Sequence, residues 1–269
     1  MTTLSELVER LKTDFPQQLI PLKQTDLDRQ KQFTVDQPRY LFRGERNAGW
    51  MSTKSTFSRF GEKQLDFTEV NYWITGVIPK IGEYYPDHYR SLYPFLKSAL
   101  TESEAAVSLP NIEFTIAAIL QHYGFDTSFI DVTSSIDVAA AFASTGKSGE
   151  IGKIMVLETS KIEDLYFDLA AIPGNRPSAQ HAFVLWGTTA LDLKSEDFIR
   201  DYSAQWFEFE LTDQDKKKFA NENLLALSHD KVAVHILDWY ASHIENNLEI
   251  SNKTAVYFAN IMEQLKTNR

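Results

Sequence analysis

One short stretch of the chain concentrates side chains that can hold a ligand or exchange protons. Residues 120–144 read LQHYGFDTSFIDVTSSIDVAAAFAS, and the polar side chains in this stretch include His122, Asp131, Thr133, Ser134 and Ser135. Apolar runs flank the polar step on both sides, where polar groups without partners are costly to bury. The stretch therefore predicts either a binding site or a bend whose polar groups satisfy one another.

Each of these side chains also has a plain structural interpretation. His122 precedes the expected end of a helix, where a histidine can cap the last carbonyls. Asp131 and Thr133 are common turn and cap formers. Ser134 and Ser135 compete for one helix cap, which leaves the other hydroxyl free for another task. The sequence alone leaves both interpretations open.

Composition limits the kinds of ligand. The 269 residues include 27 Lys and Arg against 37 Asp and Glu, a formal charge of −10, which argues against a general grip on a nucleic-acid backbone. A few arginines still suffice to bind a small phosphorylated ligand. The chain has no cysteine and no HExxH motif, so we expect no metal site and no thiolate nucleophile.

The expected location follows from the same composition. The segment MTTLSELVERLKTDF has no basic region followed by an apolar stretch, and no run of about 18 apolar residues occurs in the chain. We therefore expect a cytoplasmic protein that does not bind membranes.

Helical and strand patterns alternate along the chain. A capping box at Thr3 to Glu6 predicts a first helix, and a polar loop then leads to a strand that ends at Gly44. The helix SSIDVAAAFAS should begin at Ser134 or Ser135. Further strands are expected at SFID, GKIMVLE, HAFVLWG and WFEFEL.

Longer helical patterns occupy the middle and the end of the chain. They lie between residues 63 and 105, at 111–123, and around KVAVHILDWYASHI and TAVYFANIMEQLK. Together with the strands they predict the α+β class.

Three ordered blocks carry a family resemblance. YLFRGERNAGWMSTKSTFSRF, LQHYGFDTSFIDVTSSIDVAAAFAS and NRPSAQHAFVLWG resemble the FRG domain family, which is named for its Phe-Arg-Gly signature, here Phe42, Arg43 and Gly44. The blocks predict an FRG domain at 36–190, preceded by an N-terminal helical extension at 1–35. Residues 191–269 should add a strand and helices to the same globule.

A more distant similarity suggests an activity. TSSIDVAAAFAS is similar to the Ser-Thr-Ser segment of ADP-ribosyltransferases, in which a strand ends in hydroxyl residues and leads into a helix. This resemblance implies a split mixed sheet flanked by helices, with NAD as the substrate. Cleavage of the bond between nicotinamide and ribose develops positive charge on the sugar, which the site must stabilise.

The resemblance also implies roles for single residues. Arg43, beside Gly44, would grip the phosphates or a ribose, and His122, Thr133, Ser134 and Ser135 would shape the ribose pocket. Gln180 occupies the place where those enzymes usually have glutamate, and it would orient the ribose without supplying a negative charge. The resemblance therefore leaves three outcomes open: slow transfer, recruitment of Asp131 in place of the glutamate, or no transfer. His181 could act as an acid or base if it faces the pocket. In a strand, Gln180 and His181 point to opposite faces, so at most one of them should line the site.

A second hypothesis is that the same cleft recognises a nucleotide or a protein without catalysis. The glutamine in place of glutamate at position 180 keeps this alternative open.

Overall fold

The computed structural model describes residues 1–26, 31–51, 53, 122, 129–162, 165–168, 175–185 and 192–220. The helices expected at 63–105 and near the end of the chain lie outside this part, as does the helix at 111–123 except for His122.

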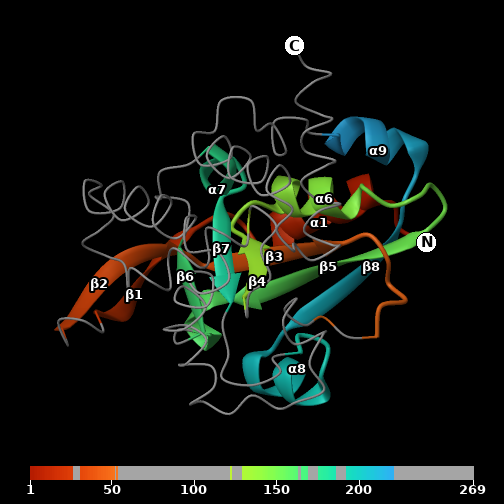
Figure 1. The fold of residues 1–269 in the computed structure, drawn as a ribbon. Coiled ribbons are helices and arrows are strands. Elements are labelled where there is room, and N and C mark those ends of the chain that lie inside the picture. Colours follow the sequence, from red (N-terminus) through yellow and green to blue (C-terminus); the bar gives the residue numbers. More distant parts are fainter. Residues whose placement is uncertain are drawn as a thin grey trace, which may run out of the picture.

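Six described strands form one sheet in the order β6-β7-β4-β3-β5-β8 (Figure 1). In chain order these strands are β3 (Tyr40–Glu45), β4 (Ile130–Thr133), β5 (Ile151–Glu158), β6 (Tyr166–Asp168), β7 (Ala182–Leu185) and β8 (Gln205–Glu210). All neighbours in this sheet run antiparallel. The prediction of a mixed sheet is therefore wrong for the described strands, because apolar runs identify strands without fixing their direction.

The junction between β3 and β4 is narrow. These strands pair only at Phe42 and Thr133, whereas β3 pairs with β5 and β4 pairs with β7 along their whole lengths. Among the described strands, the sheet thus consists of two three-stranded halves that meet at one residue pair.

A separate hairpin occupies part of the segment expected to be an extension and a polar loop. Strands β1 (Leu19–Asp26) and β2 (Lys31–Pro38) pair in antiparallel register, from Leu19 with Pro38 to Asp26 with Lys31. Leu19 is exposed and Leu22 is buried. The polar residues of this segment, such as Lys23, Gln24 and Thr25, give only a weak strand pattern, so the loop prediction was wrong.

Helices lie on both faces of the sheet (Figure 1). The described helices are α1 (Leu4–Asp14), α6 (Ile136–Ala143), α7 (Asn175–Ala179), α8 (Glu196–Tyr202) and α9 (Asp213–Phe219), with a short 3-10 turn at Thr159–Lys161. The predicted capping box of α1 is present, with Thr3 and Glu6 bonded reciprocally. Ser135 is the N-cap of α6, which resolves the choice between the two serines.

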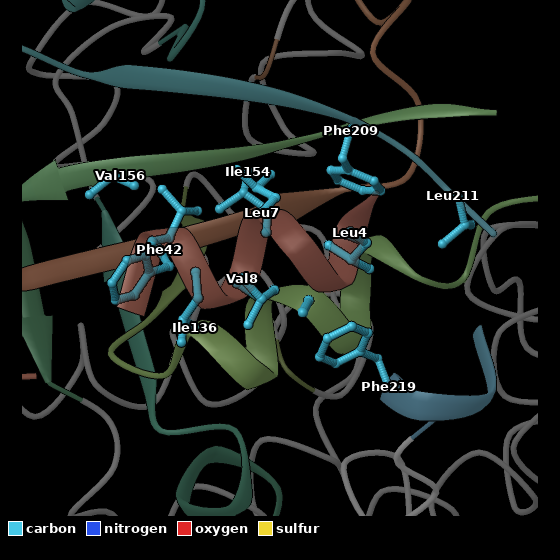
Figure 2. Close-up of a cluster of buried hydrophobic side chains, with 14 residues drawn as sticks. Leu4, Leu7, Val8, Phe42, Ile136, Ile154, Val156, Phe209, Leu211 and Phe219 are labelled. Carbon is cyan, nitrogen blue, oxygen red and sulfur yellow. The ribbon is translucent and has the colours of Figure 1, made fainter. Parts of the chain in front are cut away.

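One core cluster joins α1 and α6 to the sheet (Figure 2). Leu4, Leu7 and Val8 of α1 are fully buried against Phe42 of β3 and Phe209 of β8. The amino-terminal helix is therefore an integral part of the globule. A second cluster on the opposite face includes Leu41, Met155, Leu157 and Phe198 of α8.

Candidate functional site

The three residues of the Phe-Arg-Gly signature in β3 have different structural roles. Phe42 is buried in the core beneath α1 and α6. A Cβ atom at Gly44 would lie 1.8 Å from the backbone oxygen of Ala139, so this position requires glycine for β3 and α6 to pack closely. Arg43 points away from this core, as alternation along a strand requires.

Arg43 lies where the two halves of the sheet meet. Its Nη1 donates to the carbonyl oxygen of Asp131 on β4 at 2.6 Å, just beyond the Phe42 and Thr133 pair. Its Nε lies 3.4 Å from Glu45 Oε1. The arginine therefore bridges the two halves of the sheet beyond their last paired residues.

A pocket of about 250 Å³ opens at this junction. Its lining combines residues from both halves of the sheet with side chains from α6 and from the segment after β3. The described lining residues are Phe42, Arg43, Gly44, Glu45, Arg46, Trp50, His122, Asp131, Val132, Thr133, Phe142, Thr145, Gln180 and Ala182. The pocket thus brings together Arg43, Gly44, His122, Asp131, Thr133 and Gln180 of the residues singled out in the sequence.

An imidazole connects two of the predicted site residues. His122 Nδ1 lies 3.0 Å from Gln180 Oε1, and His122 Nε2 lies 3.5 Å from Asp131 Oδ1. Because an amide oxygen only accepts, the Nδ1 atom carries the hydrogen in the first contact. The His122 side chain is 3% exposed and the Asp131 side chain is 44% exposed. Of these two side chains, solvent or a ligand therefore reaches the Asp131 carboxylate more readily.

The contacts of His122 differ from the simple capping role considered for it. Its ring links Gln180 to Asp131 across 58 positions of sequence in one case and 9 in the other. The 3.5 Å between His122 Nε2 and Asp131 Oδ1 is an ion-pair distance, longer than the about 2.6–3.2 Å of a contact that transfers a proton directly. Gln180 orients the imidazole, whereas the sequence predicted a direct contact between Gln180 and a ribose.

The hydroxyl residues serve mainly to fix the local backbone. Thr133 Oγ1 donates to Gln180 O at 2.7 Å and accepts from Ser135 N at 3.0 Å. Ser135 Oγ accepts from Val138 N as the α6 cap. Ser134 N donates to His181 O at 3.1 Å. Neither serine is among the described residues that line the pocket, so their predicted ribose contacts remain predictions.

Gln180 and His181 lie in a turn between α7 and β7, so the expected strand begins later, at Ala182. His181 has a φ of 43°, a left-handed conformation that breaks strand alternation. Gln180 is buried at 3% exposure and lines the pocket, while His181 is exposed. The expectation that these two residues alternate along a strand is therefore wrong, and of the two, Gln180 is the one among the described residues that line this pocket.

Sequence reasoning missed a buried carboxylate beside Arg43. Glu45 is 1% exposed and its Oε1 accepts from Thr53 Oγ1 at 2.6 Å, while Lys194 Nζ lies 2.7 Å from its Oε2. Strand alternation in Arg43-Gly44-Glu45 places the two charged side chains on one face, and this signal could have revealed Glu45. Nothing in the sequence connects Lys194 to it.

The mouth of the pocket carries a cation and two aromatic rings. The Arg46 guanidinium lies 5.8 Å from the centroid of the Trp50 ring, within cation–π range. Trp50 is 41% exposed and Phe142 is 37% exposed, and both line the pocket. Such a rim suits a flat ring flanked by an anionic group.

Two searches of the described residues gave negative results. Within this part of the chain, no three His, Cys, Asp or Glu side chains are grouped so that they could hold a metal ion. Nor does any helix of the described ranges have the length and apolarity needed to cross a membrane.

Comparison with protein families agrees with the signature in β3. Residues 38–150 match the FRG domain family. This segment resembles the FRG domain family, and all described pocket residues except Gln180 and Ala182 lie in it. Searches of curated proteins and of solved structures found no significant match.

Proposed function

We propose that the pocket binds NAD and cleaves the bond between nicotinamide and ribose. The observation that carries this proposal is the convergence of a guanidinium, a solvent-reached carboxylate and a buried imidazole, from Arg43, Asp131 and His122, in one pocket. The ADP-ribosyltransferase resemblance of the α6 segment suggests NAD among nucleotide ligands.

Two parts of NAD have complementary groups among the described residues. The diphosphate pairs with the guanidinium groups of Arg43 and Arg46, and the flat nicotinamide ring lies against Trp50 or Phe142. A volume of about 250 Å³ lies just below the range of about 300–1,000 Å³ for small-molecule sites. The pocket therefore encloses only a part of NAD, and the remainder extends over the mouth.

The reaction needs a group that stabilises positive charge on the ribose. ADP-ribosyltransferases usually have a glutamate at the position of Gln180. Asp131 takes the role of this glutamate, because the Asp131 carboxylate is partly exposed in the pocket. As the bond to nicotinamide breaks, its electron pair leaves with the ring and the ribose becomes oxocarbenium-like. Water or an acceptor nucleophile then bonds to the ribose carbon and gives its proton to Asp131, with His122 as the second proton carrier.

A test of the proposal is to mix the purified protein with NAD and follow both binding and products by proton NMR. Saturation transfer from protein to NAD, together with free nicotinamide that accumulates over hours, supports the enzyme. An Asp131→Asn variant that binds NAD but releases no nicotinamide supports the assigned charge.

One observation favours a non-catalytic recognition module as the second candidate. Gln180, at the position where ADP-ribosyltransferases usually have glutamate, carries a neutral amide that contacts His122, and the buried Glu45 is engaged by Thr53 and Lys194. Binding of NAD without nicotinamide release, in the presence of protein acceptors as well as water, would support this candidate.

A further inference from the structure

The segment that joins β7 to α8 contacts the rim of the pocket, although it lies outside the residues that match the FRG family. Thr53 N donates to Asp192 Oδ1 at 2.8 Å, and Leu193 N donates to Thr53 O at 3.0 Å. Both backbone groups of Thr53 are thus bound by the later segment. Trp206 Nε1 donates to Leu193 O at 3.2 Å, which ties the same segment to β8.

Lys194 lies at the centre of these contacts. Its Nζ lies 2.7 Å from Glu45 Oε2 and 2.6 Å from the carbonyl oxygen of Trp50, and it lies 5.1 Å from the centre of the Trp206 ring. The side chain is only 10% exposed. One buried ammonium group therefore contacts the carboxylate beside Arg43, the backbone of a rim residue and an aromatic face.

We infer that Lys194 is a positioning residue, which sets the places of Trp50 and Arg43 and so makes the pocket competent for its ligand. Lys194 acts on these two residues through two contacts. The bond to Trp50 O fixes the backbone from which the rim ring projects. The ion pair with Glu45 holds the carboxylate that lies 3.4 Å from Arg43 Nε, so the guanidinium has one preferred place.

The inference means that an FRG domain cut at the end of its family match would have an incomplete site in this protein. A segment more than forty positions beyond residue 150 secures two of the groups that the proposed function uses. The choice of NAD as the ligand rests on the proposed function, whereas the place of Trp50 does not depend on it.

The experiment compares Lys194→Met with Lys153→Met in the full chain. Lys153 is the matched control, because it stands opposite Glu45 on β5 but pairs with Glu208 at 3.1 Å. Both changes remove one positive charge from a lysine, and of the two lysines Lys194 is the one that contacts Glu45 and the backbone of Trp50. The chain is labelled with 5-fluorotryptophan, and Trp50→Phe assigns one of the five tryptophan resonances.

Lys194→Met should shift or broaden the Trp50 fluorine resonance and weaken NAD binding about tenfold, since small misplacements of binding groups have large effects. Saturating turnover should fall less than affinity. Lys194→Arg should restore the resonance at least partly, and Lys153→Met should leave it in place. An unchanged Trp50 resonance and an unchanged NAD affinity in Lys194→Met would overturn the inference.

Two additional measurements keep the inference testable if a variant does not fold or if NAD does not bind. If Lys194→Met does not fold because Glu45 loses its partner, the double change Glu45→Gln with Lys194→Met removes both charges and is read in the same way. If the unchanged protein does not bind NAD, the proposed function fails, while the fluorine resonance still decides whether Lys194 positions Trp50.

Discussion

The guanidinium of Arg43 donates a hydrogen bond of 2.6 Å to the backbone oxygen of Asp131, across the one-pair junction of the sheet. The arginine of the family signature is thus bound to the residue whose carboxylate enters the pocket. The Arg43 side chain therefore contributes both to ligand binding and to the stability of the sheet, and substitutions of Arg43 should affect both properties.

Replacement of Arg43 by Met should abolish NAD binding and also destabilise the fold by about 2 kcal/mol, because the change removes a charge-assisted bond to a mostly buried carbonyl. Urea unfolding and ligand NMR measure the two effects. Arg39→Met is the matched control, since the Arg39 pair with Glu158 is more exposed and should cost about 0–1 kcal/mol. Retained NAD binding in Arg43→Met would contradict the assignment.

Asp131→Asn should leave NAD binding within about threefold but lower nicotinamide release by about 10²-fold or more, because the neutral amide neither takes a proton nor stabilises positive charge. Chromatography of the released base measures the rate. Asp137→Asn, in the first turn of α6, removes a charge that pairs with Lys12 outside the pocket lining and should have no such effect. Equal losses in both variants would point to a general charge effect.

Gly44→Ala should destabilise the protein by about 3 kcal/mol or prevent folding, because the added methyl group meets the Ala139 backbone rather than a movable side chain. Gly149→Ala is an informative comparison. Gly149 has a φ of 82° with open space around its Cβ position, so only backbone strain of about 1 kcal/mol is expected. Thermal unfolding of both variants measures the difference, and equal costs would show that β3 and α6 do not pack this closely.

Asp215 gives the fold a defined response to acid. Burial raises the pKa of its carboxyl, but hydrogen bonds from Ser5 and Thr212 lower it more, so the folded-state pKa lies below the ordinary value of 3.8. The stabilisation is therefore complete only at pH values well above 3.8, from about pH 5, and is lost as the pH falls through the lower folded-state value. The stability difference between the unchanged protein and Asp215→Asn should shrink as the pH falls below about 5. Denaturant midpoints over this range measure it, and a constant difference would contradict the account.

Local patterns predicted the elements that bury a regular apolar face. The first helix follows from its capping box and from Leu4, Leu7, Val8 and Leu11, all of which are fully buried. The strand GKIMVLE was predicted from its apolar run and appears as β5, which begins one residue earlier at Ile151. By contrast, the hairpin of β1 and β2 was missed, because the many polar residues in its sequence resemble a loop.

The site was predictable only where its residues share a local pattern. Arg43 and Asp131 stand in motifs that resemble known families, and the pocket contains both. The link between His122 and Gln180 depends on tertiary packing across 58 positions, and the contact of Lys194 with Glu45 spans 149. No periodicity of a single element reports such contacts, since they arise only when the sheet halves and the segment before α8 assemble.

The most direct test of the central claim is proton NMR of the full chain with NAD, followed over several hours. The account predicts saturation transfer from the protein to NAD that is lost in Arg43→Met, and free nicotinamide that accumulates and is nearly absent in Asp131→Asn. Absence of both saturation transfer and nicotinamide in the unchanged protein would contradict the claim that this pocket binds and cleaves NAD.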